Sequence, residues 1–200
     1  APRFSAQDER EMDEIGETGE IVIAGHGRVG GIVSRILRGG GLSPTVIDFS
    51  SKQLEKLKAF NVHAYYGDAT RPDLLHAAGI ADAKLFVIAI DGKEQITELV
   101  KYVRHHYPDV HILARAVDRP HVYDLFHAGC RDIVRDTYDS SLRMGRSAIE
   151  ALGYSGDQAE RMVHTFNELD RKVMRLAAEH YDPDIPAMEN EAYLQMTRDS

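Results

Sequence analysis

The chain has 200 residues, of which 43% are apolar and 28% charged, so it has room for one domain with an appendage but not for a second catalytic domain. No apolar run approaches the roughly 20 residues that a membrane helix requires. The formal net charge is −8 and no basic stripe is present, which excludes a nucleic-acid partner. The single cysteine, Cys130, excludes a disulfide framework and favours a reducing compartment, which we expect to be the cytosol.

Residues 1–19 are expected to form an acidic linker. Up to position 20, two arginines stand against seven acidic residues, namely Asp8, Glu9, Glu11, Asp13, Glu14, Glu17 and Glu20. A segment so acidic and so poor in apolar residues buries too little surface to offset the entropy of ordering. The compact domain is therefore predicted to begin at Glu20.

From Glu20 onward, short apolar runs alternate with segments of helical period, which predicts βαβ units around a parallel sheet. Strands buried on both faces are expected at residues 21–24, 45–47, 62–66, 85–90, 111–114 and 132–134. Residues 20–136 are therefore predicted to form an α/β, Rossmann-like, doubly wound parallel sheet of six strands. Its nucleotide crevice should lie at the carboxyl ends of the strands, near the point where the strand order reverses.

Helices are expected between these strands wherever apolar residues recur at helical spacing. One such stripe covers residues 29–37 and ends at the glycines 39–41, and another covers residues 96–103. Between them, Ser50 and Gln53 stand at the spacing of a capping box ahead of a further helix.

A glycine motif, Gly25-His26-Gly27-Arg28-Val29-Gly30, follows the first expected strand and opens the first helix. The first glycine permits a tight turn, the second lets backbone amides approach a phosphate, and the third allows the helix to pack closely on the strand. The amino end of the helix offers unpaired N–H groups and a positive dipole to an anion. The motif is a candidate nucleotide-binding loop, although a glycine triplet can also mark an ordinary turn.

Acidic residues follow the second and third strands at the same predicted edge. Asp48 comes after Gly30 at about the spacing where a carboxylate accepts hydrogen bonds from ribose hydroxyls and repels a 2′-phosphate, although it could simply start a turn. This spacing favours NAD(H) or AMP over NADP. Asp68 and Thr70 either flank the adenine or its ribose, or form an Asx or helix-capping turn before Pro72, and both can hold at once.

Four sequence blocks, at residues 23–30, 66–71, 89–91 and 113–116, read IAGHGRVG, YGDATR, AID and LARA. Together and in this order they resemble the nucleotide-binding regulator of K⁺ conductance (RCK) domain, also called the TrkA-N domain. Within that family the chain looks most similar to the carboxyl-terminal domain of the Kef glutathione-regulated potassium efflux antiporters, from about Glu20 to about Lys172.

The resemblance implies a non-enzymatic, homodimeric domain that binds AMP or NAD(H) for structural purposes. It also implies that the domain gates a K⁺/H⁺ antiporter through a transmembrane transport domain of the same polypeptide, at the cytoplasmic face of the inner membrane. The implied nucleotide-binding residues are Gly25, His26, Gly27, Arg28, Val29, Gly30, Asp48, Phe49, Asp68, Ala69, Thr70, Ala89, Asp91 and Arg115.

Glutathione and its adducts control efflux in Kef systems, so the resemblance also implies an effector site. Carried over by motif position, Arg28 and Asn167 are candidate glutathione contacts. The Arg28 guanidinium can hold a carboxylate through two parallel hydrogen bonds. It could equally neutralise a ligand phosphate or form a surface ion pair. The chain departs from the Kef pattern at His26 and Val29, which replace aromatic residues often seen in that glycine loop.

Residues 137–182 are predicted to form a helical appendage, with residues 183–200 as a loosely docked tail. Helices are expected at 138–153 and 157–179, separated by a turn. Apolar residues of the second helix repeat at heptad a and d positions, namely Met162, Phe166, Leu169, Val173 and Leu176. This stripe packs either on the chain's own sheet or on a partner, and the exchanged helices that the resemblance implies favour a dimer contact.

No catalytic residue and no metal site is predicted. The histidines 105, 106 and 111 lack a carboxylate or thiol at ligand spacing, and Cys130 has no evident base partner. Two alternative functions remain: a small NAD-dependent oxidoreductase, or an RCK subunit of a K⁺ channel or of a Trk/Ktr uptake system. The oxidoreductase would need a proton donor and a substrate pocket, which dehydrogenases usually take from a second domain.

Overall fold

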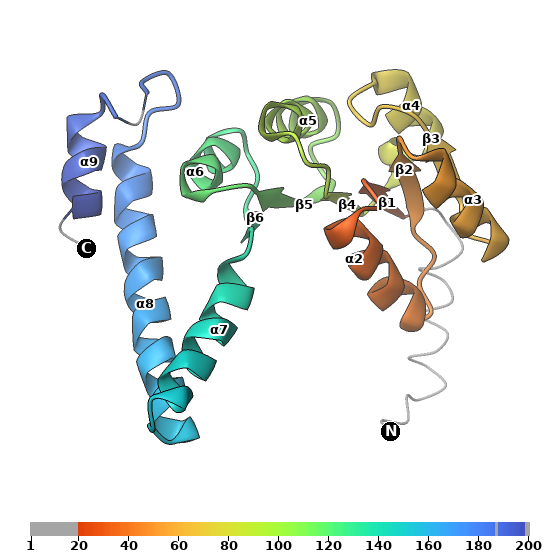
Figure 1. The fold of residues 1–200 in the computed structure, drawn as a ribbon. Helices are drawn as coiled ribbons and strands as arrows, with labels where there is room; N and C mark the ends of the chain where they lie inside the picture. Colours follow the sequence, from red (N-terminus) through yellow and green to blue (C-terminus); the bar gives the residue numbers. More distant parts are fainter. Residues whose placement is uncertain (1–19, 187, 199–200) are drawn as a thin grey trace. The chain divides into compact units, whose positions relative to one another are not determined.

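A computed structural model describes residues 20–186 and 188–198, and it contains a six-stranded sheet with the strand order β3-β2-β1-β4-β5-β6 (Figure 1). Strand β1 pairs in parallel with β2 and β4, β2 pairs in parallel with β3, and β4 with β5. The bounds are β1 Ile21–Ala24, β2 Thr45–Asp48, β3 Ala64–Tyr66, β4 Leu85–Ile88, β5 His111–Ala116 and β6 Asp132–Arg135. The predicted Rossmann-like sheet of six strands is confirmed.

The strand order reverses next to β1, because the chain first builds outward to β2 and β3 and then returns to place β4 on the other side of β1. The connecting helices are α2 Arg28–Gly39, α3 Ser51–Ala59, α4 Pro72–Ala77, the 3₁₀ turn η1 Ile80–Asp82, and α5 Lys93–His106. Helices α2 and α3 lie on one face of the sheet and α4 and α5 on the other (Figure 1). This doubly wound arrangement opens a crevice at the carboxyl ends of β1 and β4.

Burial differs between the centre and the edges of the sheet. Ile23, Ile47 and Ile88 on the three central strands are fully buried. On the edge strands, by contrast, Tyr66 of β3 is 65% exposed and Val134 of β6 is 49% exposed. The expectation that all six strands are buried on both faces is therefore wrong for the two edge strands of the described sheet.

Local sequence signals mark the starts of helices α3 and α4. The Ser50 hydroxyl accepts a hydrogen bond from the Gln53 backbone N–H at 3.4 Å, as the sequence predicts for the start of α3. Helix α4 begins at Pro72, a position in the first turn where proline is common. Because α4 has only six residues, it is too short to show a periodic pattern in the sequence.

The chain divides into two compact units, which are described separately. The first runs to Ala116 and includes Ala128–Val134, and the second comprises Val117–His127 and the chain from Arg135 onward. The second unit contains α6 Arg119–His127, α7 Tyr138–Ala151, α8 Gly156–His180 and α9 Glu191–Arg198. Ser155 and Gln158 form a capping box at the start of α8, which follows the expected turn.

The segment after residue 182 contains α9, which the sequence pattern did not reveal. Tyr193 of α9 is only 6% exposed and packs with Tyr123 of α6 and with Tyr181, which follows α8. The Asn190 side chain accepts from the Tyr193 N–H and donates to the His180 carbonyl. The expected loose docking of this segment is therefore not what the structure shows. Within the described ranges, no helix has the length and apolar character needed to cross a membrane.

Candidate functional site

A cavity of about 910 Å³ opens at the carboxyl ends of β1, β2 and β4. Twelve of the fourteen residues expected at the nucleotide site line it, namely Gly25, His26, Gly27, Arg28, Asp48, Phe49, Asp68, Ala69, Thr70, Ala89, Asp91 and Arg115. Val29 and Gly30 do not line it. Val29 packs against the apolar core instead, and Gly30 is buried at the helix–strand contact. The four motif blocks therefore meet at one edge of the sheet.

The glycine loop is shaped by close backbone contacts. Gly25 has a φ of +95°, and a Cβ there would stand 2.8 Å from the Ala89 carbonyl oxygen. The Gly25 N–H donates to the Ile47 carbonyl at 2.8 Å, which ties the loop to β2. A Cβ on Gly30 would lie 1.9 Å from the Gly25 carbonyl oxygen, so this position requires glycine for packing.

Gly27 differs from its two neighbours because it leaves open space. It is the N-cap residue of α2, and a Cβ built on it meets no heavy atom within 4 Å. Gly27 has no side chain with which to cap this helix end, and the first turn of α2 contains no acidic residue. Arg28, which is exposed, lines the cavity directly beside it. An uncapped helix amino end with an adjacent guanidinium is suited to an anion.

The Asp48 carboxylate fastens the glycine loop to the start of the next helix. Its Oδ2 accepts the His26 backbone N–H at 2.7 Å, and its Oδ1 accepts the Ser50 backbone N–H at 2.6 Å. A carboxylate has about four acceptor positions, so two remain for other donors such as hydroxyl groups. Asp48 is therefore structural, and it is also placed to accept hydrogen bonds from a ligand in the cavity.

The His26 imidazole is enclosed in a way that the sequence did not indicate. Both ring nitrogens are buried and have no hydrogen-bond partner in the described part of the chain. Burial lowers the pKa of this imidazole below its usual 6.5, while Gln53 and the Asp48 carboxylate act in the opposite direction, and Arg38 lowers it further. The ring therefore gives up its proton more readily than a free imidazole does.

Residues after β3 form the turn that the sequence allowed. The Thr70 backbone N–H and hydroxyl both donate to Asp68 Oδ1, at 2.8 and 2.7 Å, ahead of Pro72. Asp68 and Thr70 also line the cavity. The predicted turn is confirmed. It also places Asp68 and Thr70 in the lining of the cavity, where the sequence analysis expected them.

The side of the cavity near β4 and β5 contains an ion pair that joins two motif blocks. Arg115 donates to Asp91 Oδ1 at 2.8 Å and to the Ile90 carbonyl at 3.2 Å. The Arg115 side chain is 10% exposed, whereas that of Asp91 is 94% exposed. Because the pair is half in water, its main effect is to hold the guanidinium at the rim of the cavity.

Seven further residues line the cavity and were not assigned to the site from the sequence: Ile47, Ser50, Gln53, Gly67, Ile90, Gly92 and Gln95. Gln53 and Gln95 both lie in the first turn of a helix that starts at this edge. Their position could have been found from the topology, since the helices that follow β2 and β4 must begin beside the carboxyl ends of those strands.

The two candidate effector residues lie in different units. Arg28 belongs to the first unit and lines the cavity. Asn167 belongs to the second, where its Oδ1 accepts the Tyr138 hydroxyl at 3.0 Å between α8 and α7.

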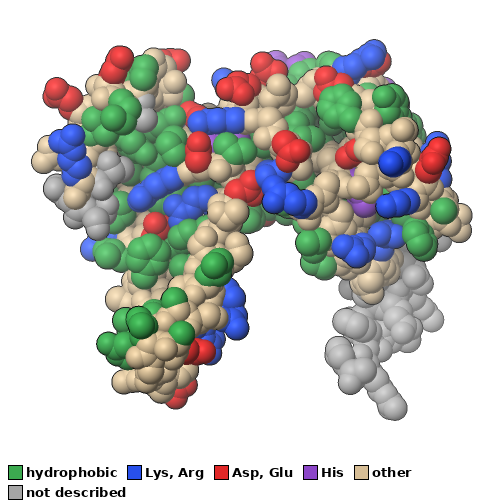
Figure 2. Space-filling view, in the orientation of Figure 1, with side chains coloured by type: hydrophobic (Ala, Val, Ile, Leu, Met, Phe, Trp, Pro, Cys, Tyr) green, Lys and Arg blue, Asp and Glu red, His purple; other side chains and the backbone are tan. Residues whose placement is uncertain are grey.

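Helices α7 and α8 leave a large apolar surface uncovered. Figure 2 shows hydrophobic side chains gathered over this helix pair, and Met144 is 74%, Leu152 80% and Phe166 54% exposed. A cavity of about 510 Å³ with an apolar lining lies between the two helices, and Leu142 and Phe166 are among its walls. The heptad residues Met162, Phe166 and Leu169 are about half exposed within this chain.

Comparison with known proteins places this architecture in a family. Residues 21–136 match the TrkA-N domain, and residues 140–200 match the potassium efflux system KefB C-terminal domain. The glutathione-regulated potassium-efflux system protein KefC of Cronobacter sakazakii is 38% identical over 174 residues, which cover 86% of this chain and 28% of that protein. KefC of Escherichia coli is 37% identical over 171 residues, with 85% and 28% covered. The chain thus spans little more than a quarter of these relatives.

Solved structures give the same result. The Kef CTD of Shewanella denitrificans, in AMP bound form, is 38% identical with a TM-score of 0.75, and the match covers 81% of this chain and 99% of that one. The GsuK channel bound to NAD is 28% identical with a TM-score of 0.52, over 57% of this chain and 20% of that one. On these matches, the chain belongs to the TrkA-N (RCK) domain family, in the form found as the carboxyl-terminal domain of Kef-type potassium efflux systems.

Proposed function

We propose that this domain binds an adenine nucleotide, AMP or NAD(H), in the cavity at the carboxyl edge of the sheet. The observation that carries the proposal is the open, uncapped amino end of α2 at Gly27, beside the Asp48 carboxylate. A phosphate at the helix end and ribose hydroxyls at Asp48 would satisfy both groups. The same carboxylate would repel the 2′-phosphate of NADP.

The size of the cavity and the relatives support a nucleotide of this class. A volume of about 910 Å³ is within the usual range for small-ligand sites. One similar structure contains AMP and another contains NAD. The cavity is built from backbone contacts and a cationic rim, and we propose that the nucleotide serves as a fixed structural part and is not consumed as a reagent.

We further propose that the domain regulates K⁺ efflux from the cytoplasmic face of the inner membrane. Its relatives are potassium-efflux proteins more than three times its length, so the transport domain would belong to the same polypeptide. The exposed apolar surface of α7 and α8 would form a homodimer contact. Arg28 and Asn167 are each proposed as contacts of glutathione or an adduct. Such an effector must bind two states of the dimer unequally in order to gate transport.

Isothermal titration of the purified chain with AMP, NADH and NADPH tests the nucleotide site. We expect AMP or NADH to bind, and NADPH to bind at least about tenfold more weakly because its 2′-phosphate meets Asp48. If none of these nucleotides bound, the proposal would be wrong. Steady NADH oxidation across a panel of small carbonyl compounds would favour the oxidoreductase instead.

The substitution Gly27→Ala tests where the phosphate lies. The added methyl group meets no protein atom within 4 Å, so the fold should survive while the space for the ligand is reduced. We expect affinity to fall about tenfold or more. Gly39→Ala is the matched control, because its Cβ also meets nothing within 4 Å and it lies at the opposite end of the same helix. Equal affinities in the two variants would remove the phosphate from the α2 amino end.

The effector proposal is tested by adding glutathione to the nucleotide-loaded chain. Arg28→Gln and Asn167→Ala should each weaken glutathione binding. Arg28 is exposed, so Arg28→Gln should leave the melting temperature close to that of the parent, whereas Asn167→Ala should lower it modestly because the Tyr138 hydroxyl loses its acceptor. Glutathione binding that is unchanged in both variants would remove these residues from the effector site.

A further inference from the structure

A second cavity lies in the first unit, at the amino ends of β2 and β3, whereas the glycine loop lies at the carboxyl ends of the strands. It has a volume of about 490 Å³ and is built from the end of α2, the end of α3 and the segments that lead into β2 and β3. Thr45 begins β2 and His63 immediately precedes β3, whereas the glycine loop follows the end of β1. Because these strands are parallel, the two cavities open at opposite edges of the sheet.

The unusual group in this second cavity is the guanidinium of Arg38. Its Nε is fully buried and has no acceptor in the described part of the chain. No acidic residue is among the described residues that line the cavity. A partly buried cation is unfavourable where no carboxylate pairs with it, and none of the described residues around this cavity supplies one. An anion in the cavity would offset that cost through the two terminal nitrogens of the guanidinium, because Nε itself is closed to solvent.

Neighbouring side chains indicate what kind of anion fits. Ser43, Thr45, Asn61 and His63 surround the cavity with hydroxyl, amide and imidazole groups that can donate hydrogen bonds. Phe60, at its rim, is 73% exposed and offers a flat apolar surface. This combination of one fork-shaped cation, several neutral donors and an aromatic wall is typical of sites for small organic anions.

We propose that this second cavity binds a small organic oxyanion with a planar apolar portion, and that Arg38 is its counter-ion. Such a ligand would place its carboxylate or phosphate on the guanidinium and its planar portion against Phe60. Helices α2 and α3 both end here, and their carboxyl ends oppose an anion. The repulsion between these helix ends and an anion fades within the last turn, and it is weaker than a charge-assisted hydrogen bond to Arg38. The anion would therefore bind at the guanidinium and not next to the helix ends.

Amide-resolved NMR titration of the full 200-residue chain tests the site, with phenylacetate, phenyl phosphate and neutral 2-phenylethanol as probes. The two anions distinguish a carboxylate ligand from a phosphate ligand. We expect saturable shifts at Ser43, Asn61 and His63 with at least one anion and none with the alcohol. The shifts should persist with excess AMP, which separates this site from the glycine-loop cavity whether or not AMP binds there.

Substitutions on one helix provide the control. Arg38→Gln should weaken anion binding about tenfold or more. Arg35→Gln should leave it unchanged, because Arg35 is exposed on the same helix and does not line the cavity. Shifts that persist in Arg38→Gln, equal shifts with the alcohol, or no saturable shift at the solubility limit of both anions would overturn the proposal.

Thermal unfolding without added anion gives a second measurement. If the Arg38 guanidinium lacks an internal partner, Arg38→Met should leave the melting temperature unchanged or raise it. Arg104→Met should lower it, because the Arg104 guanidinium donates to the Gly129, Pro108 and Val110 carbonyls. A fall in Arg38→Met as large as that in Arg104→Met would assign Arg38 a structural role and overturn the proposal.

Discussion

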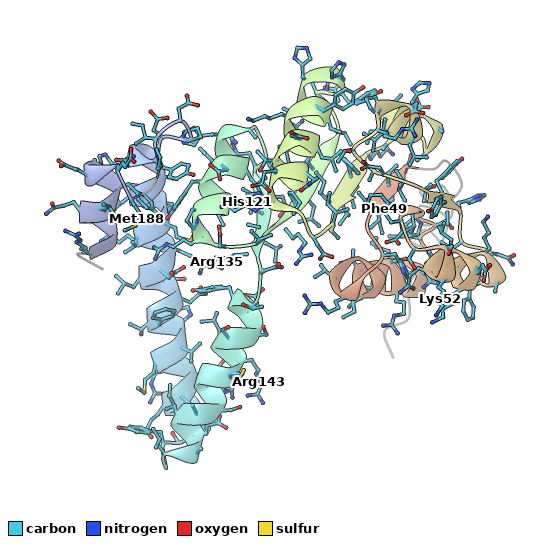
Figure 3. All side chains as sticks on the ribbon, turned by 45° about the horizontal axis from the view of Figure 1, so that its top comes forward. Phe49, Lys52, His121, Arg135, Arg143 and Met188 are labelled. Atoms are coloured by element: carbon cyan, nitrogen blue, oxygen red, sulfur yellow. The ribbon has the colours of Figure 1, made fainter. Side chains whose placement is uncertain are left out.

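The glycine-loop cavity and the α7–α8 helix pair differ in how far one chain completes them. At the cavity, Asp48 is bonded to two backbone N–H groups and Asp68 to Thr70, so the loops are fixed before any ligand arrives. On the helix pair, large apolar side chains remain exposed, for example Met144 of α7 and Phe166 of α8. Arg143, labelled in Figure 3, also projects from α7. The first region is preorganised, and the second has apolar surface that needs another surface to cover it.

The largest expected effect concerns the close contact beneath the glycine loop. Gly30→Ala would place a methyl carbon 1.9 Å from the Gly25 carbonyl oxygen, so helix and loop must separate. We expect a loss of about 3 kcal/mol or more in the free energy of unfolding, enough to prevent folding of a marginally stable domain. Chemical denaturation with Gly39→Ala as control measures it. A stable Gly30→Ala variant would show that the loop is not rigidly packed.

A second prediction concerns the ion pair at the start of the helical unit. Arg135, which is labelled in Figure 3, lies at the end of β6. It pairs with Asp170 at 2.9 Å, with side chains 15% and 10% exposed, and its guanidinium carbon lies 3.8 Å from the centre of the Tyr138 ring. Asp170→Ala leaves that cation without its carboxylate, and we expect a loss of about 3 kcal/mol in unfolding free energy. Glu150→Ala, which breaks the more exposed Arg146–Glu150 pair, should cost about 0.5 kcal/mol or less.

The two variants of this second prediction are compared by urea denaturation followed by circular dichroism. Similar losses for Asp170→Ala and Glu150→Ala would show that the Arg135–Asp170 pair is open to solvent. The second unit would then be less tightly packed around this pair than the low exposure of the two side chains indicates.

The third prediction tests the incomplete region directly. Phe166→Ser removes a large apolar side chain that is 54% exposed on α8, and we expect self-association to weaken by about 2 kcal/mol, a roughly 30-fold change in dissociation constant. Sedimentation equilibrium measures it, with nucleotide affinity as the control that should not change. Unchanged self-association would place any dimer contact elsewhere.

The smallest effect is a pH dependence that arises at the glycine loop. Because burial lowers the pKa of His26 in the folded chain, the unfolded chain binds its proton more readily, and stability is lost as the pH falls below about 6.5. His26→Phe removes this titration, so its unfolding free energy should fall less between pH 7 and pH 5 than that of the parent. Parallel curves for the two proteins would show that the His26 ring is hydrated.

The sequence could predict much of the glycine-loop cavity because its signals are local. A glycine triplet between an apolar run and a helical stripe specifies a strand, a turn and a helix end in one stretch, and Ser50 and Gln53 mark the next helix start. It could not reveal that the His26 ring nitrogens are buried without a partner among the described residues, or that Arg115 reaches Asp91, because both depend on elements brought together from distant parts of the chain. The short α4 and the docked α9 were missed for a related reason: neither is long enough to show a period.

By itself, the sequence determined the six strands, the glycine loop and the place of Asp48, because periodicity and backbone permissiveness are properties of neighbouring residues. Only the tertiary structure decided that α6 groups with the carboxyl-terminal helices and that Tyr193 is buried among other tyrosines. It also decided that Arg38 Nε has no acceptor among the residues that the structure describes. These outcomes depend on which surfaces remain available once the sheet has formed, and long-range packing alone settles that.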